Sequence, residues 1–328
     1  SLYGRKGAIV ILDPNSGEVI AIASAPDFDP AVFVNKSYSS IGSMFNDPAA
    51  PLMNRAISGT FPPGSVFKMA VAAAGLETGK IKPSTTYHCP GSLQVGSRQF
   101  KCWTTHGDQD LIQAIANSCD VFFYKTGLGV GAQTLHDYAA RFGFGKPTGI
   151  EIPYESAGHV PNPFWKRMYK FQRWYDGDTA NLAIGQGALL TSPMQVCRMA
   201  AVFANGGSLV TPYIIKAIDG RDVSASHRRV SPAHLRRSTV DFIRKGMRQV
   251  VTDGTANVLA DVKPAVAGKT GTAQTSGDET HAWFTGFFPF DRPQYCICVF
   301  LEKGGHGTDA SLLVKQIISS MADEGFFK

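Results

Sequence analysis

The sequence predicts an α/β (α+β) fold in which a five-stranded, mostly antiparallel sheet is flanked by helices and joined to a helical subdomain. Strand-like segments are confined to the two ends of the chain, and helical periodicity dominates its middle. The 328 residues, 44% of them hydrophobic and 18% charged, exclude a disordered chain and suffice for a substantial core. We expect one large or two closely joined domains, with the sheet from about 7–25 and 264–328 and the helical lobe from about 60–210.

The first strands should form a β-hairpin, because the apolar runs 8–12 and 18–23 flank the turn sequence Asp13-Pro14-Asn15-Ser16-Gly17. The middle of the chain has helical patterns over 66–76, 110–125, 132–142 and 193–205. The segment 147–187 is rich in Pro, Gly and aromatic residues, and we expect it to be irregular.

The C-terminal part should complete the sheet. A predicted helix over 231–252 precedes strand-like runs at 265–274, 282–289 and 295–303, and a last helix is predicted over 310–321. The sequence has no repeats, no run of 18 apolar residues and no signal segment. The first predicted strand follows Ser1 with almost no lead-in, so we expect an upstream portion to have been removed.

One segment has the residues needed to activate a serine. Its sequence is Phe61-Pro62-Pro63-Gly64-Ser65-Val66-Phe67-Lys68. Its prolines cannot extend a helix backwards and its glycine permits a sharp turn, so a helix should begin at Ser65. Ser65 and Lys68 are three residues apart and would share one helical face. Burial, a nearby cation and the positive helix end favour a neutral amine that accepts the serine proton.

This S-x-x-K pattern alone also describes a helix-capping serine followed by a surface lysine. Two further motifs follow it in order, Ser118-Cys119-Asp120 and Lys269-Thr270-Gly271-Thr272. The ordered set S-x-x-K, S-x-D and K-T-G is typical of penicillin-binding proteins and class A β-lactamases.

With these motifs the chain resembles the transpeptidase domain of class B penicillin-binding proteins from about Gly7 to its C-terminus. Further matching blocks are Leu12-Asp13-Pro14, Asn54-Arg55-Ala56, Ala183-Ile184-Gly185-Gln186-Gly187 and Ala282-Trp283-Phe284-Thr285-Gly286. Division-type relatives usually carry Asn where this chain has Asp120, so it is most similar to the elongation-type penicillin-binding protein 2. The resemblance implies a serine β-lactamase/transpeptidase-like fold, and we expect the family's N-terminal membrane anchor and pedestal domain to be absent from this chain.

The resemblance implies catalytic roles for four residues. Ser65 would be the acylated nucleophile and Lys68 its general base. Ser118 and Lys269 would complete a proton-relay network. The backbone N–H groups of Ser65 and Thr272 would form the oxyanion hole.

The same resemblance implies how substrate binds. Lys269, Thr270, Gly271 and Thr272 would form an edge strand along which the D-Ala-D-Ala end of a stem peptide lies. Asp120 would contact the substrate peptide, although a carboxylate accepts hydrogen bonds and cannot donate them as Asn does.

The implied activity is that of a serine-type D,D-transpeptidase that cross-links peptidoglycan stem peptides during cell-wall elongation, is acylated by β-lactams and needs no cofactor for catalysis. A β-lactam sensor and a β-lactam hydrolase are alternatives; Glu151 and Glu155 precede K-T-G, but nothing marks either as a hydrolytic base. The implied partners are a membrane glycosyltransferase and an MreC-like activator, at the periplasmic face of the inner membrane. Lys and Arg exceed Asp and Glu by only 32 to 26, and we expect no nucleic-acid partner.

A second constellation consists of Cys89, Cys102, His106 and Cys119, with His88 as a substitute ligand. Three cysteines and one histidine are a recurring structural zinc set. A disulfide between Cys89 and Cys102, or buried apolar thiols, are the alternatives. Because Cys119 lies inside the S-x-D motif, a metal there would order the loop that presents the motif.

Three other cysteines, Cys197, Cys296 and Cys298, lie in apolar segments and should be core residues. The aromatic and basic stretch 165–175 could face a membrane, a glycan or a partner, or could be a solvated cover. His306 should lie in a turn near the cleft, and the sequence does not assign it a role.

Overall fold

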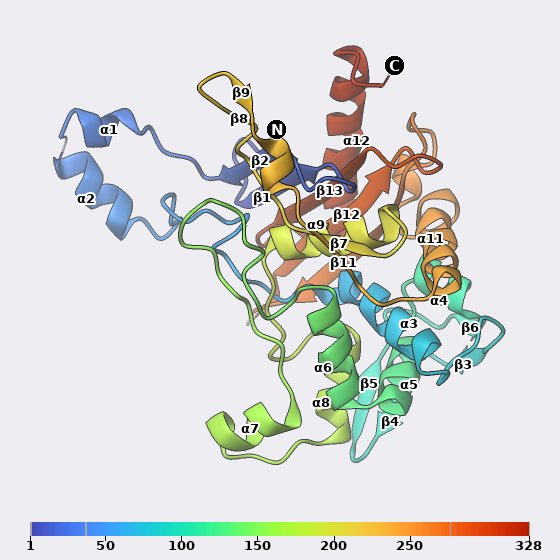
Figure 1. Ribbon diagram of the computed structural model, residues 1–328. Coiled ribbons are helices and arrows are strands. Elements are labelled where there is room, and N and C mark those ends of the chain that lie inside the picture. The colour runs from blue at the N-terminus through green and yellow to red at the C-terminus, as the bar shows by residue number, and fades with distance from the viewer. Residues whose placement is uncertain (1, 37, 276, 328) are drawn as a thin grey trace.

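The computed structural model describes residues 2–36, 38–275 and 277–327. Its centre is one five-stranded sheet in the order β11-β12-β13-β1-β2 (Figure 1). The strands are β1 (Gly7–Leu12), β2 (Val19–Ala25), β11 (Ala267–Gln274), β12 (Thr280–Phe288) and β13 (Tyr295–Leu301). All four neighbouring pairs are antiparallel, which confirms the predicted sheet. The two ends of the chain meet where Gly7 pairs with Leu301 and Leu12 with Cys296.

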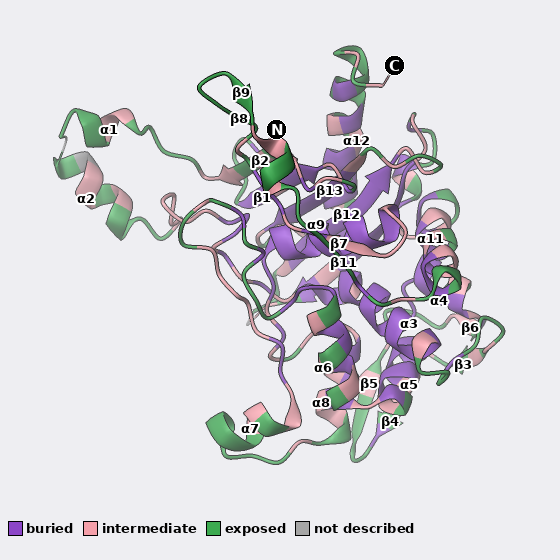
Figure 2. Cartoon of the chain, viewed as in Figure 1, coloured by how far each residue is buried: buried purple, intermediate pink, exposed green. Residues whose placement is uncertain are grey.

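The middle strands of the sheet are buried on both faces, as the burial of almost every residue of β12 and β13 shows. Helix α9 (Pro193–Ala204) covers one face and α12 (Gly307–Asp323) covers the other (Figures 1 and 2). Cys197, Cys296 and Cys298 are fully buried in this core, as predicted. Helix α11 (Arg237–Thr252) packs beside β11 at the edge that bears K-T-G.

A group of helices adjoins that edge. At its centre is α3 (Lys68–Glu77), which is preceded by a 3-10 turn, η1 (Gly64–Phe67). The other helices are α4 (Leu111–Ala116), α5 (Asp120–Val130), α6 (Ala132–Arg141), α7 (Pro163–Lys170) and α8 (Asp176–Ala183). Helices α5 and α8 pack closely at Gly127. Glycine permits this approach, because a Cβ there would lie only 2.3 Å from Ala183 Cβ.

Several sequence-based boundaries were wrong. The helix predicted over 110–125 is interrupted between α4 and α5. The segment 147–187 is not wholly irregular: α7 begins where the Asn162 side chain accepts a hydrogen bond from Trp165 N at 2.7 Å and proline occupies the first turn. The helix predicted from 231 begins only at Arg237, because Val230–Pro232 pairs with a strand.

Short elements complete the chain. Two two-stranded ladders, β3–β6 and β4–β5, lie beside α5. The remaining elements are α1 (Ala31–Val34), α2 (Tyr38–Asn46), β3 (Tyr87–Cys89), β4 (Ser92–Val95), β5 (Arg98–Lys101), β6 (Gly107–Gln109), β7 (Ser208–Val210), β8 (Ala217–Ile218), β9 (Arg221–Asp222), α10 (Ser224–His227), β10 (Val230–Pro232) and η2 (Asn257–Leu259). Within the described ranges, no helix has both the length and the apolar character needed to cross a bilayer.

Candidate active site

The turn that carries Ser65 is fixed by backbone packing. Gly64 has φ +57°, and a Cβ there would lie 2.7 Å from Thr272 O, so only glycine fits. Gly64 N donates to Gly185 O at 2.9 Å, and Trp283 Nε1 donates to Pro62 O at 3.0 Å. Ser65 therefore lies in a 3-10 turn clamped against β11, and the α-helix predicted to begin at Ser65 begins at Lys68.

The Lys68 side chain joins the start of α3 to the S-x-D segment. Its amine is fully buried and donates to Ser118 O at 2.8 Å, Ser118 Oγ at 3.2 Å and Asp120 Oδ1 at 2.7 Å. The Asp120 carboxylate offsets the cost of burying the ammonium, an ion pair that the sequence reasoning did not foresee. Across the described residues, no hydrogen bond joins Lys68 to Ser65.

The break between α4 and α5 presents Ser118 to this amine. Ser118 adopts the left-handed conformation with φ +53°, which is uncommon for a residue other than glycine. Its N–H donates to Ile115 O at 3.2 Å, and Cys119 N donates to Ala114 O at 2.9 Å. These bonds close the end of α4, so α5 can start afresh at Asp120.

Lys269 approaches the same place from β11 and is fully buried. Burial, together with the charge of Lys68, lowers the pKa of Lys269 well below its ordinary value of 10.5. Its amine donates to Thr270 O at 3.0 Å and lies 3.5 Å from Thr270 Oγ1. Burial also raises the pKa of the Asp120 carboxyl, while Lys68 acts in the opposite direction. Lys269 is therefore a candidate for a neutral amine, and the Asp120 carboxyl is costly to ionise.

These groups surround one cavity of about 870 Å³. Its lining includes the predicted Ser65, Ser118, Asp120, Thr270 and Thr272. Lys68 and Lys269 lie beneath its floor, and Gly271 packs on the serine turn, where a Cβ would lie 3.0 Å from Pro63 O.

His306, which the sequence placed in a turn near the cleft, also lines the cavity, and it caps α12 together with Asp309. Sequence reasoning missed several lining residues. Thr255, whose Oγ1 lies 2.5 Å from Thr270 Oγ1, had no visible signal. Gln186 belongs to a block that was noticed but given no role.

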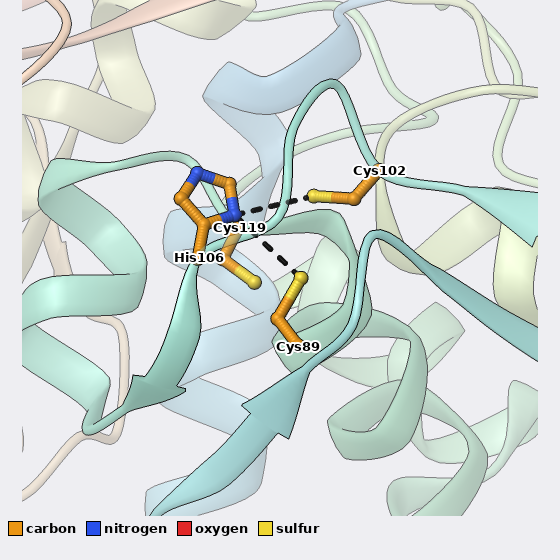
Figure 3. Close-up of side chains that lie close together, drawn as sticks. All are labelled: Cys89, Cys102, His106 and Cys119. Carbon is orange, nitrogen blue, oxygen red and sulfur yellow. Dashed lines mark hydrogen bonds between the residues drawn. The ribbon is translucent and has the colours of Figure 1, made fainter.

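The four predicted metal ligands converge beside the cavity (Figure 3). Their ligand atoms all lie within 4.8 Å of one another. His106 Nδ1 lies 3.6 Å from Cys89 Sγ and 3.5 Å from Cys102 Sγ. A tetrahedral zinc with ordinary bond lengths would place sulfur and nitrogen about 3.6 Å apart. The donor set and its spacing therefore fit zinc.

The thiols of this cluster influence one another. The neighbouring Cys119 thiol lowers the pKa of Cys102, and Cys102 together with burial raises the pKa of Cys119. Cys102 Sγ also accepts a hydrogen bond from Asp120 N at 3.2 Å, so the cluster touches the S-x-D segment directly. Cys89 and Cys102 are free thiols in this structure rather than a disulfide. His88 does not substitute as a ligand, because it is exposed and bonds Asp108 at 2.8 Å.

This sheet, with its three motifs in order along the chain, is that of the penicillin-binding transpeptidase class. The chain matches the penicillin binding protein transpeptidase domain over residues 7–320 and belongs to that family, as its motifs indicated. It is similar to the peptidoglycan D,D-transpeptidase MrdA of Haemophilus influenzae, at 36% identity over 97% of this chain and 53% of that protein. The corresponding protein of Acinetobacter baumannii is 34% identical over 96% of this chain and 50% of its own length.

Solved structures agree with these relatives. The chain is similar to Pseudomonas aeruginosa penicillin-binding protein 2 in complex with WCK 5153, with a TM-score of 0.88 and 36% identity over 97% of this chain and 71% of that one. It is also similar to Helicobacter pylori penicillin-binding protein 2 in a complex with MreC, with a TM-score of 0.90 and 33% identity over 99% and 62%. The predicted fold and the predicted similarity to penicillin-binding protein 2 are confirmed. The chain spans about half the length of the curated relatives it matches.

Proposed function

We propose that this chain is the catalytic part of a peptidoglycan D,D-transpeptidase that acts in cell-wall elongation and is acylated by β-lactams. The observation that carries the proposal is the convergence of three distant motifs on one cavity, with Lys68 bonded to both Ser118 and Asp120. Named relatives with this activity support it.

In the first half-reaction, Ser65 Oγ attacks the carbonyl of the penultimate D-Ala, and the bond to the terminal D-Ala breaks. Lys68 and Asp120 share one proton. When that proton lies on Asp120, the Lys68 amine is neutral and can receive the proton of Ser65. The raised pKa of the Asp120 carboxyl supports that state. Ser118 Oγ, 3.2 Å from Lys68 Nζ, then passes its proton to the departing D-Ala amine and takes up the proton that Lys68 received from Ser65.

The developing oxyanion would be bound by the N–H groups of Ser65 and Thr272. The tight contact between Gly64 and the Thr272 backbone supports this placement. Each such donor contributes about 3 to 4 kcal/mol to transition-state stabilisation in other acyltransferases. The hydroxyls of Thr270 and Thr272 would hold the terminal carboxylate along β11, and the buried Lys269 amine would act on it through Thr270, whose Oγ1 lies 3.5 Å away. In the second half-reaction an amine of a neighbouring stem attacks the ester carbonyl and releases Ser65.

The hydrolase alternative needs a base that activates water. Among the described residues that line the cavity, Asp120 is the sole acid, and it is bonded to Lys68. Glu155 instead accepts from Thr148 N and Gly149 N, and Glu151 accepts from Ile214 N. This arrangement favours slow deacylation by water, which is also compatible with a β-lactam sensor.

We also propose a structural zinc ion held by Cys89, Cys102, His106 and Cys119. When bound, the ion would link three segments to one another: β3, the segment that follows β5, and the start of α5. Cys102 Sγ, which accepts the Asp120 N–H, would then hold the S-x-D segment at a fixed distance from Lys68. Catalysis itself needs no metal in this proposal.

In the full-length protein we propose a position at the periplasmic face of the inner membrane, with an MreC-like activator and a membrane glycosyltransferase as partners. The Helicobacter pylori relative was solved with MreC. A further relative, 36% identical over 97% of this chain, comes from a peptidoglycan synthase complex that coordinates polymerization and crosslinking.

Intact-protein mass spectrometry after benzylpenicillin treatment tests the activity. We expect one stable penicilloyl adduct on the chain and none on Ser65→Ala. Rapid loss of the adduct would instead identify a hydrolase, and the absence of any adduct would refute the proposal. Cross-linking of defined stem peptides then separates a transpeptidase from a sensor.

A further inference from the structure

A second cavity, of about 300 Å³, opens beside the catalytic one between α7 and α8; we call it the α7–α8 cavity. Its wall includes Trp165, Lys170, Gln172 and Trp174. Asn181 and Gln186 line both cavities, so the two cavities share part of their walls. The aromatic and basic stretch that the sequence left without a role therefore borders the active site.

The polar side chains of this cavity are available to a ligand. In the described part of the chain, the side-chain amides of Gln172, Asn181 and Gln186 make no hydrogen bond. Each amide offers two donors and an acceptor, the groups that pair with peptide N–H and C=O. A segment of peptide backbone is the ligand that such a set satisfies.

The cavity also has one unneutralised cation. Lys166 is neutralised by Asp178, with Nζ–O distances of 2.6 and 2.8 Å. Lys170, by contrast, has no carboxylate within the described ranges, and its Nζ lies 5.8 Å from the centre of the Trp165 ring. A carboxylate on the ligand would pair with this exposed ammonium.

The walls are held in place without a ligand. Trp165 packs on His159 with ring centroids 4.3 Å apart, and Trp174 Nε1 donates to Thr179 Oγ1 at 2.8 Å. The Lys166–Asp178 pair fastens α7 to α8. The site is therefore largely preformed, which lowers the entropic cost of binding.

We propose that the α7–α8 cavity binds an acidic segment of a peptidoglycan stem peptide, with Lys170 pairing with a stem carboxylate and the three amides with its backbone. This inference rests on the proposed function, because it places the ligand next to the acylated serine. The segment belongs either to the donor stem that acylates Ser65 or to the acceptor stem that resolves the acyl-enzyme.

The test uses the zinc-loaded chain and matched pairs of peptides. The donor pair ends in D-Ala-D-Ala and carries an internal carboxylate that is either free or amidated. The acceptor pair carries a free amine and the same internal group in both forms. D-Ala release measures use of the donor, and the ratio of cross-linked to hydrolysed product measures use of the acceptor. Lys170→Gln is compared with Arg167→Gln, an exposed cation of the same helix that lies outside the cavity wall.

For one of the two stems, we expect Lys170→Gln to reduce the preference for the free-acid over the amidated peptide by about two- to fivefold, the range of partly exposed ion pairs. Arg167→Gln should leave that preference unchanged. An effect on D-Ala release identifies the donor stem, and an effect on the product ratio identifies the acceptor stem. If neither ratio depends on Lys170, or if Arg167→Gln has the same effect, the inference is wrong. Acylation of the unmodified chain by benzylpenicillin reports separately on the proposed function.

Discussion

Replacing Asp120 by alanine should expose the cost of burying Lys68 without its partner. The Lys68 amine is fully buried, and Asp120 Oδ1 lies 2.7 Å away with its side chain 15% exposed. Removing one partner of a buried ion pair costs about 3–5 kcal/mol of unfolding free energy. The chain can instead fold with a neutral amine, and releasing a proton from an ordinary lysine near pH 7.5 costs about 4 kcal/mol. We therefore expect Asp120→Ala to lose about 3–4 kcal/mol at that pH.

The loss should shrink as pH rises. If the variant folds with a neutral amine, its unfolded state binds one proton more than its folded state, so the variant gains about 1.4 kcal/mol of stability per pH unit up to the ordinary lysine pKa. Urea unfolding followed by tryptophan fluorescence near pH 7.5 and near pH 9 measures both values. Asp261→Ala, which removes an exposed partner of Lys315 at 2.8 Å, is the control and should change little. A loss below about 1 kcal/mol, or one that grows with pH, would refute the reasoning.

Three other perturbations follow from the geometry. Gly64→Ala should slow β-lactam acylation at least tenfold, because φ is +57° and the new Cβ would lie 2.7 Å from Thr272 O; Gly129→Ala, whose Cβ has nothing within 4 Å, should leave acylation unchanged. Lys269→Met should abolish a rise in melting temperature with pH, because the unfolded chain binds one proton more than the folded chain between the lowered pKa of Lys269 and 10.5; an unchanged slope would contradict this. Cys119→Ala, or removal of metal by a chelator, should lower the melting temperature and the acylation rate together; metal-free protein that acylates at the normal rate would contradict the ordering role.

The sheet was predictable because local signals and tertiary structure agree there. Strands at both ends of the chain are apolar and bounded by turns, and burial on two faces requires those apolar runs. The interruption at Ser118 was not predictable, because the sequence through α4 and α5 reads as one helix. At the left-handed turn, Lys68 bonds Ser118 Oγ and Cys102 Sγ accepts from Asp120 N, and neither partner is a sequence neighbour of the turn.

The boundaries of α7 show the same distinction. The aromatic and basic pattern indicated a surface segment, and its residues are indeed unburied. The pattern did not reveal that Trp165 and Lys170 border a cavity that shares wall residues with the catalytic cavity. That position follows from the Lys166–Asp178 pair, which joins two helices that are separated by a loop.

The sequence by itself determined the chemistry available to this protein. It showed Ser65 as the proposed nucleophile, three motifs in order, and a Cys₃His set, because residue type and short spacing are local properties. Only the tertiary structure decided which charges meet. It buried Lys68 and Lys269, placed Asp120 against Lys68, and brought the metal cluster against the Asp120 N–H. Lys68 and Asp120 are 52 residues apart in the sequence, and Cys102 and Asp120 are 18 apart. The energies that set protonation depend on distances and burial that no local pattern contains.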